Sequence, residues 1–157
     1  MGAMPIHRLG VISDTHGLLR DEAVDALQGV ERILHAGDVQ DPAILERLGR
    51  IAPVTAVRGN VDHGPVLGKL PTTATVEVGD ARLVLVHILH DLEIDPAKKG
   101  YDAVIYGHSH QPTVETKDGV LYLNPGSAGP RRFTLPVCLY VLTVRGRELE
   151  PERIDLA

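Results

Sequence analysis

Two histidines separated by one residue, His108 and His110, follow an apolar run in the stretch YGHSHQP. On an extended backbone, residues i and i+2 project from the same face, so both imidazoles are expected to enter one small volume. Neighbouring imidazoles repel each other when protonated, and a bound metal ion holds them neutral. The alternative is a polar surface loop rich in histidine. This stretch alone does not decide between the two interpretations.

Donor side chains also follow other apolar runs. VISDTHG supplies Asp14 and His16, RILHAGD supplies Asp38, VTAVRGN supplies Asn60, and ARLVLVH supplies His87. With the histidine pair they make seven nitrogen or oxygen donors at five predicted strand ends. Because ligands of open α/β sheets bind beyond the carboxyl ends of the strands, we expect these side chains to share one site.

Each donor taken singly has a structural alternative. Turns suit Asp14 and Asn60, a helix cap suits Asp38, a surface position suits His16, and a core edge suits His87. Seven donors at five strand ends, with no thiol among them, favour one metal site over seven separate roles. Three glycines precede donors, where the chain is expected to turn sharply without Cβ strain: Gly37, Gly59 and Gly107.

Short β-branched runs alternate with helical segments in the first half of the chain. Strands are predicted over residues 8–13, 32–36 and 53–57, and helices over 20–28 and 41–49, the second capped by Asp41. This βαβαβ order predicts parallel strands with helical crossovers. Further strands are predicted over 73–79, 81–88 and 102–107, with hairpins over 112–124 and 136–155 and a helical turn over 95–100. We therefore expect an α/β chain with a mainly parallel half followed by an antiparallel half.

The composition narrows the class of protein. The 157 residues suit a single domain, 1–157, and residues 1–3 are interpreted as a cloning remnant before a start at Met4. A net charge of −5 and few aromatic residues argue against binding of long nucleic acid. The single cysteine, Cys138, is predicted to be a buried free thiol. No apolar run approaches membrane-spanning length and no leader opens the chain, so we expect a cytoplasmic location and no membrane partner.

The motifs DTH, GD, GN, the strand-end His87, GHSH and the later NPGS resemble those of the calcineurin-like metallophosphoesterase superfamily. The set is most similar to the small stand-alone bacterial and archaeal phosphodiesterases, and the resemblance runs from VISDTHG to LNPGSAGPRR. It implies a four-layer αββα sandwich, two mixed β-sheets flanked by helices. It also implies that one metal ion is held by Asp14, His16, Asp38 and His110, and a second by Asp38, Asn60, His87 and His108, with Asp38 bridging.

Such a pair of cations suits hydrolysis of phosphodiesters. Two dications about 3.5–4 Å apart repel each other, so a shared carboxylate and a bridging hydroxide belong between them. The cations lower the pKa of bound water and offset the charge of an anionic phosphoester. Oxygen and imidazole donors suit Mn, Fe, Co, Ni or Zn, and the resemblance favours manganese. The expected partner is a small phosphodiester substrate, and a homo-oligomer is possible.

Two positions depart from the family pattern. Val61 stands where many members have the histidine of GNH, so this position offers no proton to a leaving group. Ile88 stands where a glycine usually follows the ligand histidine, so the loop over the second metal is expected to differ. His90 is the alternative to His87 as a ligand, and His63 is the alternative source of a proton, but a surface role is favoured for both.

The remaining motifs leave alternatives open. His35 is predicted to be structural beside the site, and NPGS is either a plain turn or a wall of the site with Arg131 or Arg132 near the substrate phosphate. One rival function is a scaffold, because a branch with this fold serves in eukaryotic membrane coats with a degraded metal site; seven competent donors argue against it. A second rival is a phosphomonoesterase, against which the missing GNH histidine and the small size argue.

Overall fold

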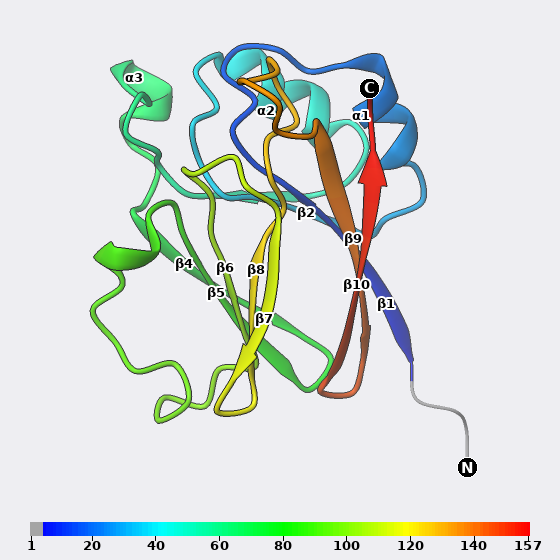
Figure 1. Ribbon diagram of the computed structural model, residues 1–157, viewed down its shortest axis with the longest axis vertical. Helices are drawn as coiled ribbons and strands as arrows, with labels where there is room; N and C mark the ends of the chain where they lie inside the picture. Colours follow the sequence, from blue (N-terminus) through cyan, green and yellow to red (C-terminus); the bar gives the residue numbers. More distant parts are fainter. Residues whose placement is uncertain (1–4) are drawn as a thin grey trace.

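Two five-stranded β-sheets face each other in the computed structural model, which describes residues 5–157 (Figure 1). The first sheet has the order β10 (Glu148–Asp155), β9 (Cys138–Arg145), β1 (Ile6–Ile12), β2 (Arg32–His35), β3 (Val54–Ala56). The second has the order β4 (Thr73–Val78), β5 (Ala81–Val86), β6 (Ala103–Ile105), β8 (Val120–Asn124), β7 (Thr113–Lys117). The predicted sandwich of two mixed sheets is confirmed; the interpretation of residues 1–3 as a cloning remnant lies outside the described residues.

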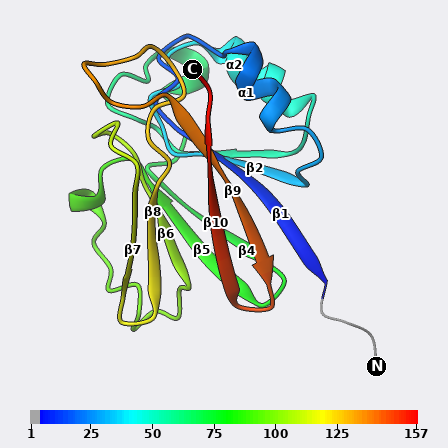
Figure 2. The same cartoon turned by 45° about the vertical axis from the view of Figure 1, so that its right-hand side comes forward.

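The first sheet contains the predicted βαβαβ unit. Strands β1, β2 and β3 are parallel, and helices α1 (Asp21–Ala26) and α2 (Pro42–Gly49) connect them. Asp41 caps α2, because its Oδ1 accepts a hydrogen bond from the Ala43 amide at 3.0 Å, and Pro42 occupies the first turn. Both helices lie on the side of this sheet that faces away from the second sheet (Figure 2). Leu27 and Leu48 of this layer are buried against Ile33 and Leu139 of the sheet.

The second half of the chain differs from the antiparallel arrangement expected. Strands β5, β6 and β8 are parallel to one another, and only β4 and β7 run antiparallel, at the two edges. The last hairpin, β9 and β10, returns to the first sheet beside β1. The predicted hairpins are present, but hairpin patterns report only pairings between neighbours in sequence. The parallel pairings depend on crossovers that carry no such local signal.

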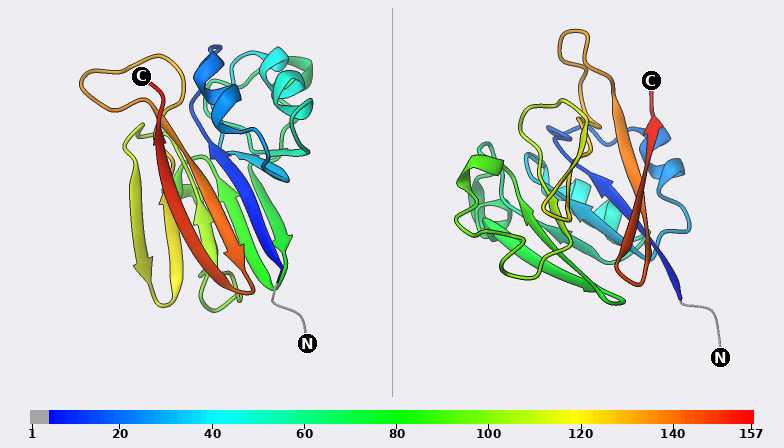
Figure 3. Two further views of the ribbon diagram at one scale, coloured as in Figure 1. Left: turned by 90° about the vertical axis from the view of Figure 1, so that its right-hand side faces the viewer. Right: turned by 60° about the horizontal axis from the view of Figure 1, so that its bottom comes forward.

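The outer face of the second sheet carries little helix. Two short elements were not expected from the sequence, α3 (Gly64–Leu67) and the 3₁₀ turn η1 (Leu89–Asp91). The segment after β5 supplies Leu89, Leu92 and Tyr101, which pack against Val84 and Val86 of the sheet. Figure 3 shows this face covered by an irregular segment, whereas the opposite face of the sandwich carries α1 and α2. The fourth layer is therefore thin.

The layer between the sheets holds the main core. It includes Leu9, Leu34, Leu83 and Ile105, all fully buried, and each such side chain contributes about 1.5–3 kcal/mol relative to an exposed one. Cys138 is buried as predicted, its thiol donates to the Pro125 carbonyl at 3.2 Å, and burial raises its pKa to about 11.

Among residues 5–157, no helix has the length and apolar character needed to cross a membrane.

Candidate metal centre

Five of the seven predicted site residues have a left-handed backbone. The φ angles are 54° at Asp14, 45° at His16, 58° at Asp38, 75° at His108 and 62° at His110. Such conformations cost a non-glycine residue on the order of 1–3 kcal/mol and persist where the surroundings enforce them, often at functional sites. The loops after β1, β2 and β6 therefore hold their donors in strained but defined positions.

This geometry corrects the expectation for the histidine pair. Strand β6 ends at Ile105, so His108 and His110 do not lie on extended backbone and do not enter one volume. The His110 ring lies 5.1 Å from the His16 ring, whereas the His108 ring lies 5.3 Å from the His87 ring, measured between centroids. The two histidines contribute to two adjacent groups of donors.

The first group contains Asp14, His16 and His110. Asp14 is fully buried, and its Oδ1 lies 3.7 Å from His16 Nε2 and 3.4 Å from His110 Nε2. Its Oδ2 accepts hydrogen bonds from the Ser13 hydroxyl at 2.7 Å and the His108 amide at 3.2 Å. Asp14 Oδ1 and His16 Nε2 are buried without a hydrogen-bond partner, which is the arrangement that a cation between them would satisfy.

The second group contains Asp38, His87 and His108, with Asn60 beside them. His87 Nδ1–H donates to the Ala36 carbonyl at 2.7 Å, so Nε2 carries the lone pair. That Nε2 faces Asp38 Oδ2 at 3.1 Å and Asn60 Oδ1 at 3.0 Å, and Asn60 Oδ1 lies 3.2 Å from His108 Nδ1. A lone pair facing two oxygen acceptors requires either a proton or a metal ion among them.

Asp38 lies between the two groups. Its Oδ2 is 3.5 Å from His16 Nε2 and 3.1 Å from His87 Nε2, and its Oδ1 accepts from the Val61 amide at 3.1 Å. The seven donors therefore divide as the family resemblance implies, with one carboxylate shared. That they ligate metal stays a prediction.

The charges of the site are coupled. Burial alone would raise the pKa of Asp14, but His110, His16 and Ser13 reverse the shift and hold this pKa below its usual range. Asp14 raises the pKa of His16. Burial lowers the pKa of His87, but Asp38 and Asp14 together with the Ala36 carbonyl outweigh it, so that this pKa is raised. Two buried carboxylates that attract protons onto imidazoles attract a dication for the same reason. Oxygen and imidazole donors, without sulfur, fit a divalent transition metal.

Two supporting side chains were not identified from the sequence. Gln40 Oε1 lies 3.1 Å from His16 Nδ1, an arrangement that leaves His16 Nε2 free when Nδ1 carries the hydrogen. Asp62 is buried and accepts three backbone hydrogen bonds, from Asp38 at 3.0 Å, Gly59 at 2.8 Å and Gln40 at 2.9 Å. Asp62 thereby joins the loop after β2 to the loop after β3. The one feature of the sequence that could have pointed to Asp62 is that an acidic residue stands two positions after Asn60.

Replacing Asp62 with alanine is expected to lower the free energy of unfolding by about 3–5 kcal/mol, because three amide hydrogens at the site lose their acceptor. Asp41→Ala is the matched control, since it removes an exposed carboxylate that accepts one amide hydrogen, at a cost of about 1 kcal/mol. Denaturant unfolding of both metal-free variants measures the difference. Equal losses in the two variants would contradict the role assigned to Asp62.

His35 holds the first two loops together, in agreement with the structural role predicted for it. It is fully buried, its Nδ1 accepts from the Gly37 amide at 3.1 Å, and its Nε2–H donates to Thr15 Oγ1 at 3.1 Å. The Thr15 hydroxyl in turn donates to the Val39 carbonyl at 3.2 Å. Burial lowers the pKa of His35 to about 4, so the imidazole is neutral in the folded protein.

The stability that depends on neutral His35 is expected to fall as the pH falls from about 6.5 to about 4. In this range the unfolded chain binds a proton at His35 and the folded chain does not, so acid favours unfolding. The loss amounts to about 3 kcal/mol at 1.36 kcal/mol per pKa unit. His35→Gln removes this titration while the other histidines titrate in both proteins. The stability difference between wild type and variant, measured by urea unfolding with chelator, should shift by this amount; a constant difference would contradict the prediction.

The segment after β8 supports both ligand loops. The Asn124 side chain donates to the Gly107 carbonyl at 3.1 Å and to Ser109 Oγ at 3.0 Å, and Ser127 Oγ donates to the Asp14 carbonyl at 2.9 Å. NPGS is therefore more than a plain turn. Arg131 donates to the carbonyls of Leu135 and Ala157, which engages its guanidinium at the end of the chain. A role for Arg132 stays a prediction.

Other predicted residues lie around the centre. His63 and His90 are exposed, as their predicted surface roles require, at the start of α3 and within η1. Of the three glycines, only Gly37 has a positive φ, 104°. Gly59 and Gly107 are needed for a different reason, because a Cβ at either would collide with Asp38 or with Ser13.

Comparison with known proteins identifies the family. Residues 8–147 match the model of the calcineurin-like phosphoesterase superfamily domain. A protein named "Probable metallophosphoesterase" from Methanothermobacter thermautotrophicus is 35% identical over 93% of this chain and 91% of its own length. The phosphodiesterase YfcE of Escherichia coli K12 is 34% identical over 76% of this chain and 78% of its own length.

Solved structures agree with this result. A structure described as a novel archaeal phosphodiesterase superposes with a TM-score of 0.78 at 25% identity, covering 94% of this chain and 99% of that one. Vacuolar protein sorting 29 from Cryptosporidium parvum also gives a TM-score of 0.78, at 20% identity, over 97% and 98% of the two chains, a likeness of fold alone. The length of the family match and the 35% identity with a relative lead to one conclusion: the chain belongs to the calcineurin-like phosphoesterase superfamily.

Proposed function

We propose that this chain is a dinuclear metal-dependent phosphodiesterase. One observation supports the proposal above the others: Asp38 Oδ2 lies within 3.5 Å of His16 Nε2 and within 3.1 Å of His87 Nε2, between two groups of donors. A shared carboxylate between two cation sites is the arrangement that two-metal hydrolases require. When bound, two divalent cations would supply an activated water as nucleophile and would polarise the phosphoester.

The residues of this chain would bind the cations and the anionic substrate, and they orient the ligand side chains. Asp14 and Asp38 contribute two negative charges, so two dications leave two positive charges uncompensated, which favours an anionic phosphodiester over a neutral ester. The contacts of His16 with Gln40 and of His87 with Ala36 fix the direction of both imidazoles. Asp62 and Ser127 hold the loops that carry Asp38 and Asp14.

Three further properties are part of the proposal. A diester is favoured over a monoester because Val61 supplies no proton donor and because YfcE, at 34% identity, is named a phosphodiesterase. The scaffold alternative is disfavoured because six of the seven donor positions form two converging groups and the seventh, Asn60, lies beside the second group. Manganese as the native metal, a cytoplasmic location and a homo-oligomeric state stay predictions.

Metal loading and a panel of esters test the proposal together. The protein is stripped with chelator, reloaded with Mn, Fe, Co, Ni or Zn, desalted and subjected to elemental analysis; about two ions per chain are expected. Each loaded form is then assayed with bis(p-nitrophenyl) phosphate and p-nitrophenyl phosphate, and faster turnover of the diester is expected. Trace metal only, or no turnover with any metal and ester, would refute the proposal. Faster turnover of the monoester would favour a phosphomonoesterase.

A further inference from the structure

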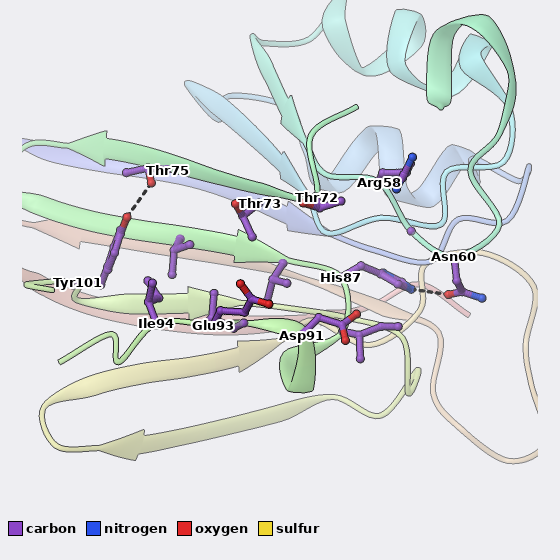
Figure 4. Close-up of a pocket in the computed structure, with 15 residues that line it drawn as sticks. Arg58, Asn60, Thr72, Thr73, Thr75, His87, Asp91, Glu93, Ile94 and Tyr101 are labelled. Atoms are coloured by element: carbon purple, nitrogen blue, oxygen red, sulfur yellow. Dashed lines mark hydrogen bonds between the residues drawn. The ribbon is translucent and has the colours of Figure 1, made fainter. Parts of the chain in front are cut away.

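A cavity of about 610 Å³ opens directly beside the second donor group. Asn60 and His87 line one end of it, and Thr75 and Tyr101 line the other (Figure 4). Between the two ends it runs over the outer face of β4 and β5, where the fourth layer of the sandwich is thin. A substrate whose phosphorus lies at the metal centre therefore has room for one ester arm along this face.

The side chains at the far end of the cavity are held in place by contacts within the protein. The Tyr101 hydroxyl and Thr75 Oγ1 are 2.8 Å apart in a hydrogen bond, and the Arg82 guanidinium lies 4.3 Å from the centre of the Tyr101 ring. Arg82 is itself held by the Lys99 carbonyl, which accepts from it at 2.7 Å. An aromatic wall locked at its hydroxyl and by a stacked cation loses little entropy when a ligand binds.

The walls combine apolar surface with carboxylates. Val84, Val86 and Leu92 supply apolar surface, while Asp91 and Glu93 line the cavity from the segment that follows β5 (Figure 4). Within the described part of the chain, neither carboxylate takes part in an ion pair, although other exposed acids do, for example Glu77 and Asp155. Arg58 is the one cationic side chain among the residues that line the cavity, at the end next to Asn60, where the phosphate would lie. Arg82, which stacks on Tyr101, is not a lining residue, and its guanidinium lies 3.9 Å from the Glu77 carboxylate.

This distribution of charge defines a class of ester arm. The positive charge of the metal centre and Arg58 lies at one end, the unpaired Asp91 carboxylate lies close to His87, and the unpaired Glu93 carboxylate lies farther along towards Tyr101, over an apolar floor. A second anionic group in the cavity would be repelled by Asp91 and Glu93. A cationic arm with apolar carbon would gain charge attraction from these carboxylates and contact with Val84, Val86 and Leu92.

We propose that this cavity binds one alcohol arm of the phosphodiester and selects an amino-alcohol arm, cationic and partly apolar. The inference rests on the proposed phosphodiesterase activity and adds its substrate class. Asp91 and Glu93 act as specificity residues that contact the arm, not as metal ligands.

Two substrates that differ in one atom test the inference. The first is p-nitrophenyl phosphocholine, and the second is its carbon isostere, p-nitrophenyl 3,3-dimethylbutyl phosphate, which has the same shape and leaving group without the positive charge. In the metal-loaded wild type, kcat/KM should be about tenfold higher for the choline ester. In the double variant Asp91→Asn, Glu93→Gln the ratio of the two kcat/KM values should fall towards one. The control Glu148→Gln, Glu150→Gln makes the same charge change on β10 and should keep the wild-type ratio.

The outcomes separate this inference from the proposed function. Turnover of both esters with a ratio near one, or a ratio unchanged in the Asp91, Glu93 variant, would overturn the inference and leave the activity intact. Absence of all turnover would refute the activity, and binding then decides the inference. Choline is titrated into zinc-loaded protein, and the ring resonances of Tyr101, assigned with Tyr101→Phe, should shift in the wild type and not in the double variant. Unshifted wild-type resonances would overturn the inference.

Discussion

Replacing Asp38 with alanine is expected to lower kcat/KM for an activated aryl phosphodiester by about a thousand-fold, on the order of 4 kcal/mol. The reason is its position: one oxygen, Oδ2, faces His16 of one donor group and His87 of the other. Loss of this carboxylate removes a donor from both groups and half of the negative charge that attracts two dications. Asn60→Ala and His87→Ala each remove a donor from the second group alone, so smaller losses are expected.

Measurements on Asp38→Ala need two controls. Asp38→Asn keeps an oxygen that accepts from the Val61 amide but lacks the charge, so it separates the role in the loop from the role in binding cations. Elemental analysis after metal loading should show fewer than the two ions expected for the wild type, and circular dichroism should show an intact fold. If Asp38→Ala kept most of the activity while Asn60→Ala or His87→Ala abolished it, the bridging assignment would be wrong.

The strand ends were predictable because chemistry and secondary structure coincide there. Apolar β-branched runs that stop at Asp14, Asp38 and His87 indicate both a buried strand and a polar group at its carboxyl end. Parallel neighbours bring such ends to one edge of a sheet, and two facing sheets bring two edges together. The convergence of donors from β1, β2 and β5 thus follows from residue types and their order.

The directions of the side chains were not predictable in the same way. Extended geometry was assumed for His108 and His110, whereas both have positive φ and enter different groups. Left-handed backbone at histidine has no pattern in the sequence, because the surrounding loops enforce it. Asp62 was missed for a related reason: its partners are three backbone amides, and backbone amides are present whatever the sequence is.

Local sequence patterns also did not predict how the strands of the second sheet pair or that the fourth layer is thin. Hairpin signals placed β4 beside β5 and β7 beside β8, but the parallel contacts among β5, β6 and β8 join segments far apart in the chain. Ile88 was expected to alter the loop over the second group, and it lines the cavity that follows that group. The sequence indicated a changed loop there without indicating the space beneath it.

The rate of diester hydrolysis is expected to depend steeply on the leaving group. The Val61 side chain has no acidic proton to donate, and the Val61 backbone amide donates its hydrogen to Asp38 at 3.1 Å. An oxygen that leaves without a donated proton leaves as an anion, so phenols of low pKa should leave far faster than those of high pKa. For aryl diesters of graded leaving-group pKa, with saturating manganese, we expect kcat/KM to fall by roughly four- to tenfold per pKa unit.

His63 provides the decisive comparison for this prediction. It is exposed at the start of α3, three residues after Asn60, and none of the described residues accepts a hydrogen bond from its side chain. If His63 takes no part, His63→Ala should show the same steep dependence as the wild type, and His90→Ala should behave likewise. A wild-type dependence that is flat, with chemistry as the slow step, would show that a side chain does protonate the leaving oxygen. If the dependence became steep only in His63→Ala, that side chain would be His63. His63 would then donate the proton that Val61 cannot supply.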